Sequence, residues 1–113
     1  MKTVILDTSF LLACLKFKID IKEGLENLLG SFEILIPDKI MDEIEKKEIK
    51  NFLESLNYRV VEIDAKNADE SIKKLALNKN YFVATVDKKL KSYLKRKKIK
   101  TLYIRNFSKI CLE

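Results

Sequence analysis

Short apolar runs that alternate with longer amphipathic segments restrict the fold of this 113-residue chain more than any other feature of its sequence. Consecutive apolar residues predict five short strands, at residues 2–6, 32–36, 59–63, 81–84 and 101–104. The segments between them carry apolar residues at helical spacing. Because strands that alternate with helices form parallel sheets covered on both faces, we expect an α/β fold of three layers (α/β/α) with a central parallel sheet of about five strands.

Capping residues set the bounds of the predicted helices. Asp20 with Glu23, and Asn67 with Glu70, have the spacing of a helix cap and a first-turn acid, and Gly30 follows a helix end. The predicted helices cover residues 9–16, 20–30, 38–47, 48–56, 67–78 and 88–97. The length predicts a single domain over residues 1–113.

The absence of histidine excludes several kinds of chemistry. Ser-His-Asp catalysis, Cys-His catalysis and imidazole-based metal sites all need a residue that this chain lacks. The two cysteines, Cys14 and Cys111, are far apart and form no Cys-x-x-Cys pair, so zinc-site spacing is absent. Cys14 lies among apolar residues and is expected in the core. Any hydrolytic activity must therefore depend on carboxylates.

Charge is divided unevenly between the two halves of the chain. Residues 1–65 contain 9 Lys+Arg and 13 Asp+Glu, whereas residues 66–113 contain 14 and 4. A basic half beside an acidic half indicates a polyanion as partner and a separate acidic site. No apolar run reaches the roughly 18 residues of a membrane span, and Asp7 ends the first run before the apolar region of a signal peptide develops. We therefore expect a cytoplasmic protein with no membrane partner.

Two acids follow predicted strands directly. Asp7 comes at the end of the first strand, and Asp87 comes just after the fourth. In open α/β sheets the functional crevice lies at the carboxyl ends of the strands. The two acids are therefore predicted at the same edge of the sheet, where they converge if their strands are neighbours.

Helix positions rank the remaining acids. On the fifth predicted helix, Asp69 lies in the first turn beside the buried stripe, whereas Glu70 points to the far side. On the third, Glu43 and Glu45 flank the apolar face on opposite margins, and geometry does not choose between them. Each acid taken singly has an ordinary explanation as a helix cap or a solvated charge. Their coincidence at one edge of the predicted fold is what indicates a site.

At these residues the chain resembles the PIN domain family. Four segments carry the resemblance, in the family's order: residues 4–9 (VILDTS), 36–45 (IPDKIMDEIE), 68–72 (ADESI) and 83–90 (VATVDKKL). The segment from residue 84 to residue 104 resembles most the branch that contains archaeal VapC-type toxins and the PIN nucleases of ribosomal RNA processing. Two positions depart from the pattern, because many relatives carry Asn where Val86 stands and a second Asp where Glu70 stands.

The resemblance implies a Mg²⁺- or Mn²⁺-dependent endoribonuclease whose four acids are Asp7, Glu43, Asp69 and Asp87. A pocket of carboxylates without His or Cys is what these hard cations prefer. Our hypothesis gives Asp7 and Asp87 direct metal contact and makes Glu43 and Asp69 ligands or holders of metal-bound water. We expect the hydroxyls of Ser9 and Thr85 to position these acids or a phosphate. The family is often dimeric and often held inactive by an antitoxin, so a homodimer, a toxin role and an antitoxin partner are implied as well.

A lysine-rich helix follows Asp87. We expect its cations to bind RNA phosphates without reading bases, although a solvated basic helix would look the same in sequence. The expected contacts are Lys88, Lys89, Lys91, Lys95 and Arg96.

Three other functions share part of this residue pattern. A non-catalytic PIN-like module that binds RNA or protein in RNA processing would keep this sequence pattern with a vestigial pocket. A phosphoryl-accepting receiver domain would place an acidic pair after the first strand, and a haloacid-dehalogenase-like phosphatase would need Asp where Ser9 stands. The sequence therefore favours the nuclease.

Overall fold

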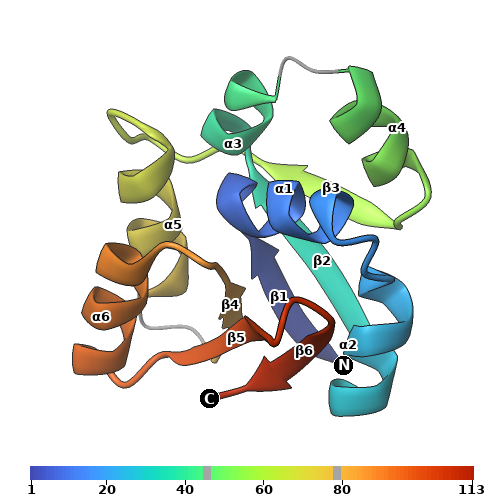
Figure 1. Ribbon diagram of the computed structural model, residues 1–113. Helices are drawn as coiled ribbons and strands as arrows, with labels where there is room; N and C mark the ends of the chain where they lie inside the picture. The colour runs from blue at the N-terminus through green and yellow to red at the C-terminus, as the bar shows by residue number, and fades with distance from the viewer. Residues whose placement is uncertain (45–46, 78–79) are drawn as a thin grey trace.

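One six-stranded sheet organises the part of the chain that the computed structural model describes, residues 1–44, 47–77 and 80–113 (Figure 1). The strand order is β3-β2-β1-β4-β5-β6. The first five strands along the chain are parallel, and β6 is antiparallel to β5. The strands are β1 (Lys2–Leu6), β2 (Phe32–Pro37), β3 (Tyr58–Val61), β4 (Phe82–Ala84), β5 (Lys100–Arg105) and β6 (Lys109–Leu112). The predicted parallel five-stranded sheet is confirmed, with one antiparallel strand added at its edge.

Helices connect the five parallel strands, whereas a short turn joins β5 to β6. They are α1 (Thr8–Lys16), α2 (Ile21–Leu29), α3 (Asp38–Glu43), α4 (Lys47–Glu54), α5 (Ala68–Ala76) and α6 (Lys88–Arg96). The predicted caps are confirmed, since the Asp20 side chain accepts a hydrogen bond from the Glu23 amide at 3.0 Å and the Asn67 side chain accepts one from the Glu70 amide at 2.9 Å. α5 packs against β2 and β4, and α6 packs against β5.

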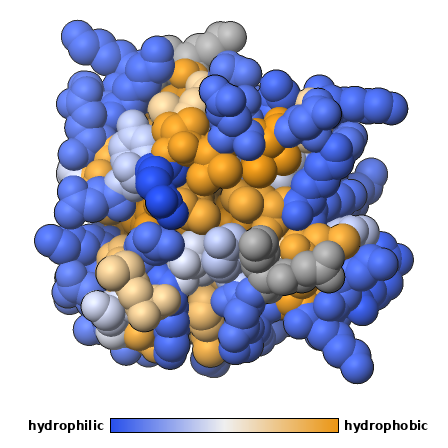
Figure 2. Space-filling view, turned by 180° about the vertical axis from the view of Figure 1, so that it is seen from behind, coloured by the Kyte–Doolittle hydropathy of each residue, from blue (hydrophilic) through white to orange (hydrophobic). Residues whose placement is uncertain are grey.

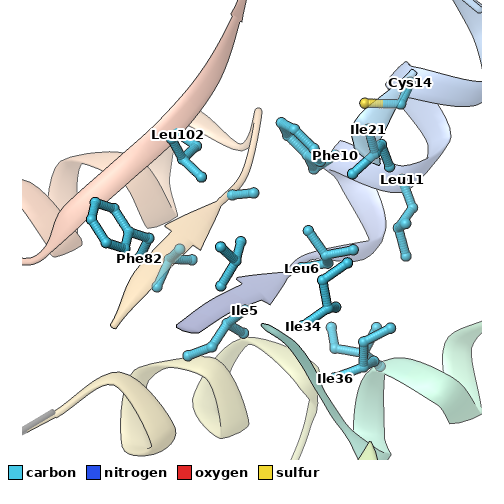
Figure 3. Close-up of a cluster of buried hydrophobic side chains, with 14 of the residues drawn as sticks. Ile5, Leu6, Phe10, Leu11, Cys14, Ile21, Ile34, Ile36, Phe82 and Leu102 are labelled. Atoms are coloured by element: carbon cyan, nitrogen blue, oxygen red, sulfur yellow. The ribbon is translucent and has the colours of Figure 1, made fainter. Parts of the chain in front are cut away.

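Apolar side chains pack on both faces of the sheet, and Figure 3 shows those between the sheet and α1 together with others on the strands. Phe10, Leu11 and Cys14 of α1 are fully buried, and Ile34 and Ile36 of β2 belong to the same apolar cluster. Alternate residues of a strand point to opposite faces, which is why these two isoleucines share a side. Burial raises the pKa of the Cys14 thiol to about 12, because the thiolate loses its hydration. Cys14 is thus a core residue, as expected.

Two segments differ from the sequence-based prediction. The helix predicted through residue 47 ends at Glu43, because Ile44 has extended backbone angles (φ −87°, ψ 94°). β6 was not predicted, since Asn106 and Phe107 precede it at φ 52° and 56°, a conformation that Phe rarely adopts. The Phe107 ring packs on Phe17 with centroids 4.9 Å apart. The predicted end of the fifth helix, at Asn78, lies outside the described residues.

Apolar side chains also reach the surface. Figure 2 shows them gathered at the centre of one face, with hydrophilic residues around them. No helix in the described ranges combines the length and the apolar character needed to cross a bilayer.

Replacing Phe10 with Ala should destabilise the fold by about 3–5 kcal/mol, because its side chain is fully buried and its removal leaves a cavity between α1 and the sheet. Leu12, on the same helix but 40% exposed, is the matched control, and Leu12→Ala should cost less than about 1 kcal/mol. Urea denaturation of both variants measures the difference. Equal costs would contradict this assignment of the core.

Candidate active site

The site lies at the end of β1, where the strand order of the sheet changes direction. β1 lies between β2 and β4, and Leu6 at the end of β1 pairs with Ala84 at the end of β4. The Asp7 amide donates to the Ala84 carbonyl at 3.1 Å, which ties the two strand ends together. Such a switch point is where open α/β sheets place their functional groups. The strands that precede Asp7 and Asp87 are therefore neighbours, which is the condition under which the two acids were expected to converge.

Two hydroxyl groups fix the Asp7 carboxylate. Ser9 Oγ and Thr85 Oγ1 each donate to Asp7 Oδ2 at 2.7 Å, and Thr85 is fully buried. Asp7 itself is only 8% exposed. Its Oδ1 accepts no hydrogen bond from the residues that the structure describes, and no buried side-chain oxygen among them lacks a partner. Oδ1 is therefore the oxygen that reaches solvent at the rim.

Asp87 is joined to Asp7 through Thr85. The Asp87 amide donates to Thr85 Oγ1 at 3.1 Å, so this hydroxyl accepts from one candidate acid while it donates to the other. Asp87 Oδ1 caps α6 by accepting from the amides of Lys89 at 2.9 Å and Leu90 at 3.2 Å. The capping explanation is thus correct for one carboxylate oxygen, while Oδ2 has no such bond within the described residues.

Glu43 reaches the same rim from the last turn of α3. This helix follows β2, the other neighbour of β1. Glu43 Oε1 accepts from Thr8 Oγ1 at 2.8 Å, and Thr8 directly follows Asp7. Three of the four predicted acids are therefore linked through the hydroxyls of residues beside them. Glu45, the alternative to Glu43, lies outside the described residues.

Asp69 is engaged differently. It lies in the first turn of α5, where its Oδ2 pairs with Lys73 Nζ at 2.9 Å, and its side chain is 49% exposed. The Lys73 ammonium also lies 4.5 Å from the centre of the Tyr93 ring on α6. No hydrogen bond in the described part of the chain connects Asp69 to the other three acids.

The oxygen donors at this rim fit a hard divalent cation by their chemistry. Carboxylates and hydroxyls are the groups that Mg²⁺ and Mn²⁺ bind, and no softer donor stands beside them. Across residues 1–44, 47–77 and 80–113, however, no three acidic or cysteine side chains converge closely enough to hold a metal ion. The structure therefore brings Asp7, Asp87 and Glu43 to one edge of the sheet without assembling a closed metal site.

The lysines of α6 differ in their surroundings. Lys91 Nζ lies 2.9 Å from Glu113 Oε2, and Lys95 Nζ lies 4.0 Å from Oε1 of the same carboxylate. The hydrogen bond from Lys91 lowers the pKa of Glu113 below its usual value. The remaining predicted RNA contacts, Lys88, Lys89 and Arg96, have no acidic partner within ion-pair distance in the described ranges.

Three residues that contact the predicted acids or lysines were not predicted from the sequence: Thr8, Lys73 and Glu113. Lys73 follows Asp69 by four residues, a helical spacing that favours an ion pair and gave a local signal. Thr8 stands beside Asp7, but its bond to Glu43 spans 35 residues. Glu113 gave no signal, because its contact with Lys91 depends on the pairing of β5 with β6.

The fold and the site define the class of this protein: a doubly wound α/β domain with acidic side chains at the switch point of its sheet. A family model described as "PIN like domain" matches residues 4–107. Ribonuclease VapC4 of Methanocaldococcus jannaschii is 32% identical over 120 residues, which cover 93% of this chain and 92% of that protein. A solved structure described as the PIN domain endonuclease Utp24 superimposes with a TM-score of 0.85 at 30% identity, covering 98% of this chain and 90% of the other. The chain belongs to the PIN domain family, and this prediction is confirmed.

Thr85→Val should lower the free energy of unfolding by about 1–3 kcal/mol, because it removes a fully buried hydroxyl that bonds both Asp7 and the Asp87 amide. Thr8→Val is the matched control. It also removes a hydroxyl that donates to a carboxylate of the rim, but this bond is exposed to solvent, so the loss should be under about 0.5 kcal/mol. Denaturant titration measures the free energy of unfolding of both variants. Similar losses would show that the buried Thr85 bonds contribute no more stability than the exposed Thr8 bond.

Proposed function

We propose that this chain is a metal-dependent endoribonuclease that hydrolyses RNA phosphodiester bonds with Asp7, Glu43, Asp69 and Asp87. One observation carries the proposal: at the end of the central strand, the Asp7 carboxylate is nearly buried, with one oxygen fixed by two hydroxyls and the other open to the rim. Helix capping does not explain the position of this carboxylate, because the Asp7 side chain makes no cap hydrogen bond to α1. The match to a ribonuclease and to an endonuclease over nearly the whole chain supports the same activity.

The chain's own residues perform three tasks in this proposal. Asp7 and Asp87 bind the cation directly, and Glu43 and Asp69 complete the oxygen ligands or hold water beside it. Ser9 and Thr85 keep Asp7 in one orientation, so that its free oxygen points to the same place throughout the reaction. A divalent cation bound there supplies the positive charge that activates water and stabilises the leaving oxygen during attack on phosphorus.

Asp69 can join these ligands through Oδ1, the oxygen that does not pair with Lys73, or by leaving Lys73 altogether. The pair is partly exposed, with side-chain exposures of 49% for Asp69 and 32% for Lys73, so the separation costs little free energy in water. In the proposed active state Lys73 keeps its contact with the Tyr93 ring and remains close to the site as a cation.

A non-catalytic RNA- or protein-binding module is the second candidate. The pairing of Asp69 with Lys73 and the absence of three converging acids among the described residues favour it. Cleavage that depends on a metal distinguishes the two, because a vestigial site binds RNA without cutting it.

Asp7→Asn should reduce RNA cleavage by more than about 100-fold, because the neutral amide binds a divalent cation far less well than the carboxylate does. Asp42→Asn is the matched control, since Asp42 is an exposed acid on α3 beside Glu43. Purified protein is incubated with structured and single-stranded RNA in Mn²⁺, in Mg²⁺ or in EDTA, and the products are separated on gels.

We expect cleavage only in the metal samples, loss in Asp7→Asn and retention in Asp42→Asn. Circular dichroism of both variants verifies that the fold is intact. The same assay with Asp69→Asn and Glu70→Gln identifies the third acid. Cleavage by Asp7→Asn at the wild-type rate, or cleavage in EDTA, would rule out the proposed mechanism.

We also propose that the chain forms a homodimer through the apolar centre of the face in Figure 2. Exposed apolar surface with a polar rim is typical of protein–protein contacts. Sedimentation velocity should show about twice the 13.2 kDa chain mass at micromolar concentration. A monomer at all concentrations would instead favour an antitoxin, the partner that a toxin role requires, as the protein that covers this face.

A further inference from the structure

The cations of α6 lie on two flanks of the helix. Leu90 and Leu94 are its buried stripe. At about 100° per residue, Lys91 and Lys95 lie on one side of this stripe, whereas Lys89 and Arg96, two turns apart, lie on the other. Figure 1 shows α6 between α5 and β5, so each flank faces a different neighbour.

The first flank faces the C-terminal strands and is occupied by protein groups. Glu113, which follows β6, pairs with both Lys91 and Lys95. The Lys91 ammonium also lies 4.3 Å from the centre of the Tyr103 ring on β5. An RNA phosphate competes with the Glu113 carboxylate for the Lys91 ammonium, so it gains less there than at a lysine without an acidic partner.

The second flank faces α5 and leads to the acids. Tyr93 lies on this side of α6, and the Lys73 ammonium of α5 lies 4.5 Å from its ring centre. Lys73 pairs with Asp69, and α6 begins at the Asp87 cap, so this flank runs beside Asp69 and reaches Asp87 at the N-terminal end of the helix. Lys89 and Arg96 are exposed here, and no acid within the described ranges pairs with them.

We infer that RNA binds along the α5-facing flank of α6, on Lys89 and Arg96, and that Glu113 competes with the RNA for Lys91 and Lys95. This inference rests on the proposed function, which it deepens by giving the path of the substrate. The bound strand passes between Asp69 and Asp87, whereas a strand on the opposite flank would run beside β5 and β6, away from the rim. The contacts are to phosphates, so they fix the position of the RNA without selecting its sequence.

Two double variants with equal loss of charge test the path. Lys89→Gln/Arg96→Gln and Lys91→Gln/Lys95→Gln each remove two positive charges from the same helix and keep a residue that favours helix. Fluorescence anisotropy with a labelled single-stranded RNA, in EDTA to prevent cleavage, gives the affinity between about 50 and about 200 mM salt. Thermal melts verify that both variants are folded.

We expect the slope of log affinity against log salt to fall by about 1.4 for Lys89→Gln/Arg96→Gln, at about 0.7 for each phosphate contact on a single strand. The corresponding loss of affinity is on the order of 10-fold at 0.1 M salt. Lys91→Gln/Lys95→Gln should lower the slope by less, because Glu113 already offsets one of these two charges.

Equal losses in the two variants, a loss confined to Lys91→Gln/Lys95→Gln, or wild-type binding that does not depend on salt would overturn the inference. The cleavage assay of the wild-type protein is read separately. Absence of cleavage together with the expected difference in binding would remove the nuclease proposal and leave the RNA path established.

Discussion

The pairing of β1 with β4, closed by the Thr85 hydroxyl, is the contact on which the site depends. Parallel strands that are neighbours in space but distant in sequence bring Asp7 and Asp87 to one edge. Thr85 then donates to one acid and accepts from the backbone of the other. A buried hydroxyl with both bonds satisfied holds this geometry firmly, because breaking either bond leaves a polar group unpaired away from water.

The acids differ in how firmly they are held. Asp7 is nearly buried and fixed by two hydroxyls, whereas Glu43 and Asp69 are exposed and bonded to Thr8 and Lys73. Like charges brought together repel one another, and a cation is what reduces that repulsion. One acid of the rim is thus fixed in position, while the others are held by weak, solvent-exposed bonds that break at little cost.

The uneven charge distribution along the sequence places basic residues next to the acidic rim in the fold. The basic half supplies α6, which begins at Asp87, so the cations expected to bind phosphate start at the acidic rim itself. The two flanks of α6 differ as well, because Glu113, which follows β6, pairs with Lys91 and Lys95 on one of them. The net charge of a helix alone therefore does not tell how many of its cations can bind a polyanion. Acidic residues on neighbouring elements also determine which of them are available.

The sequence by itself determined the alternation of strands and helices, the caps at Asp20 and Asn67, and the position of Asp7 and Asp87 at strand ends. These features depend on local apolar spacing and on helix-end chemistry, which are written in consecutive residues. Only the tertiary structure decided that Thr85 bridges two acids, that β6 extends the sheet, and that Glu113 pairs with lysines on one flank of α6. Each of these joins residues that are brought together by strand pairing, and no local pattern in the sequence encodes which distant side chains will meet.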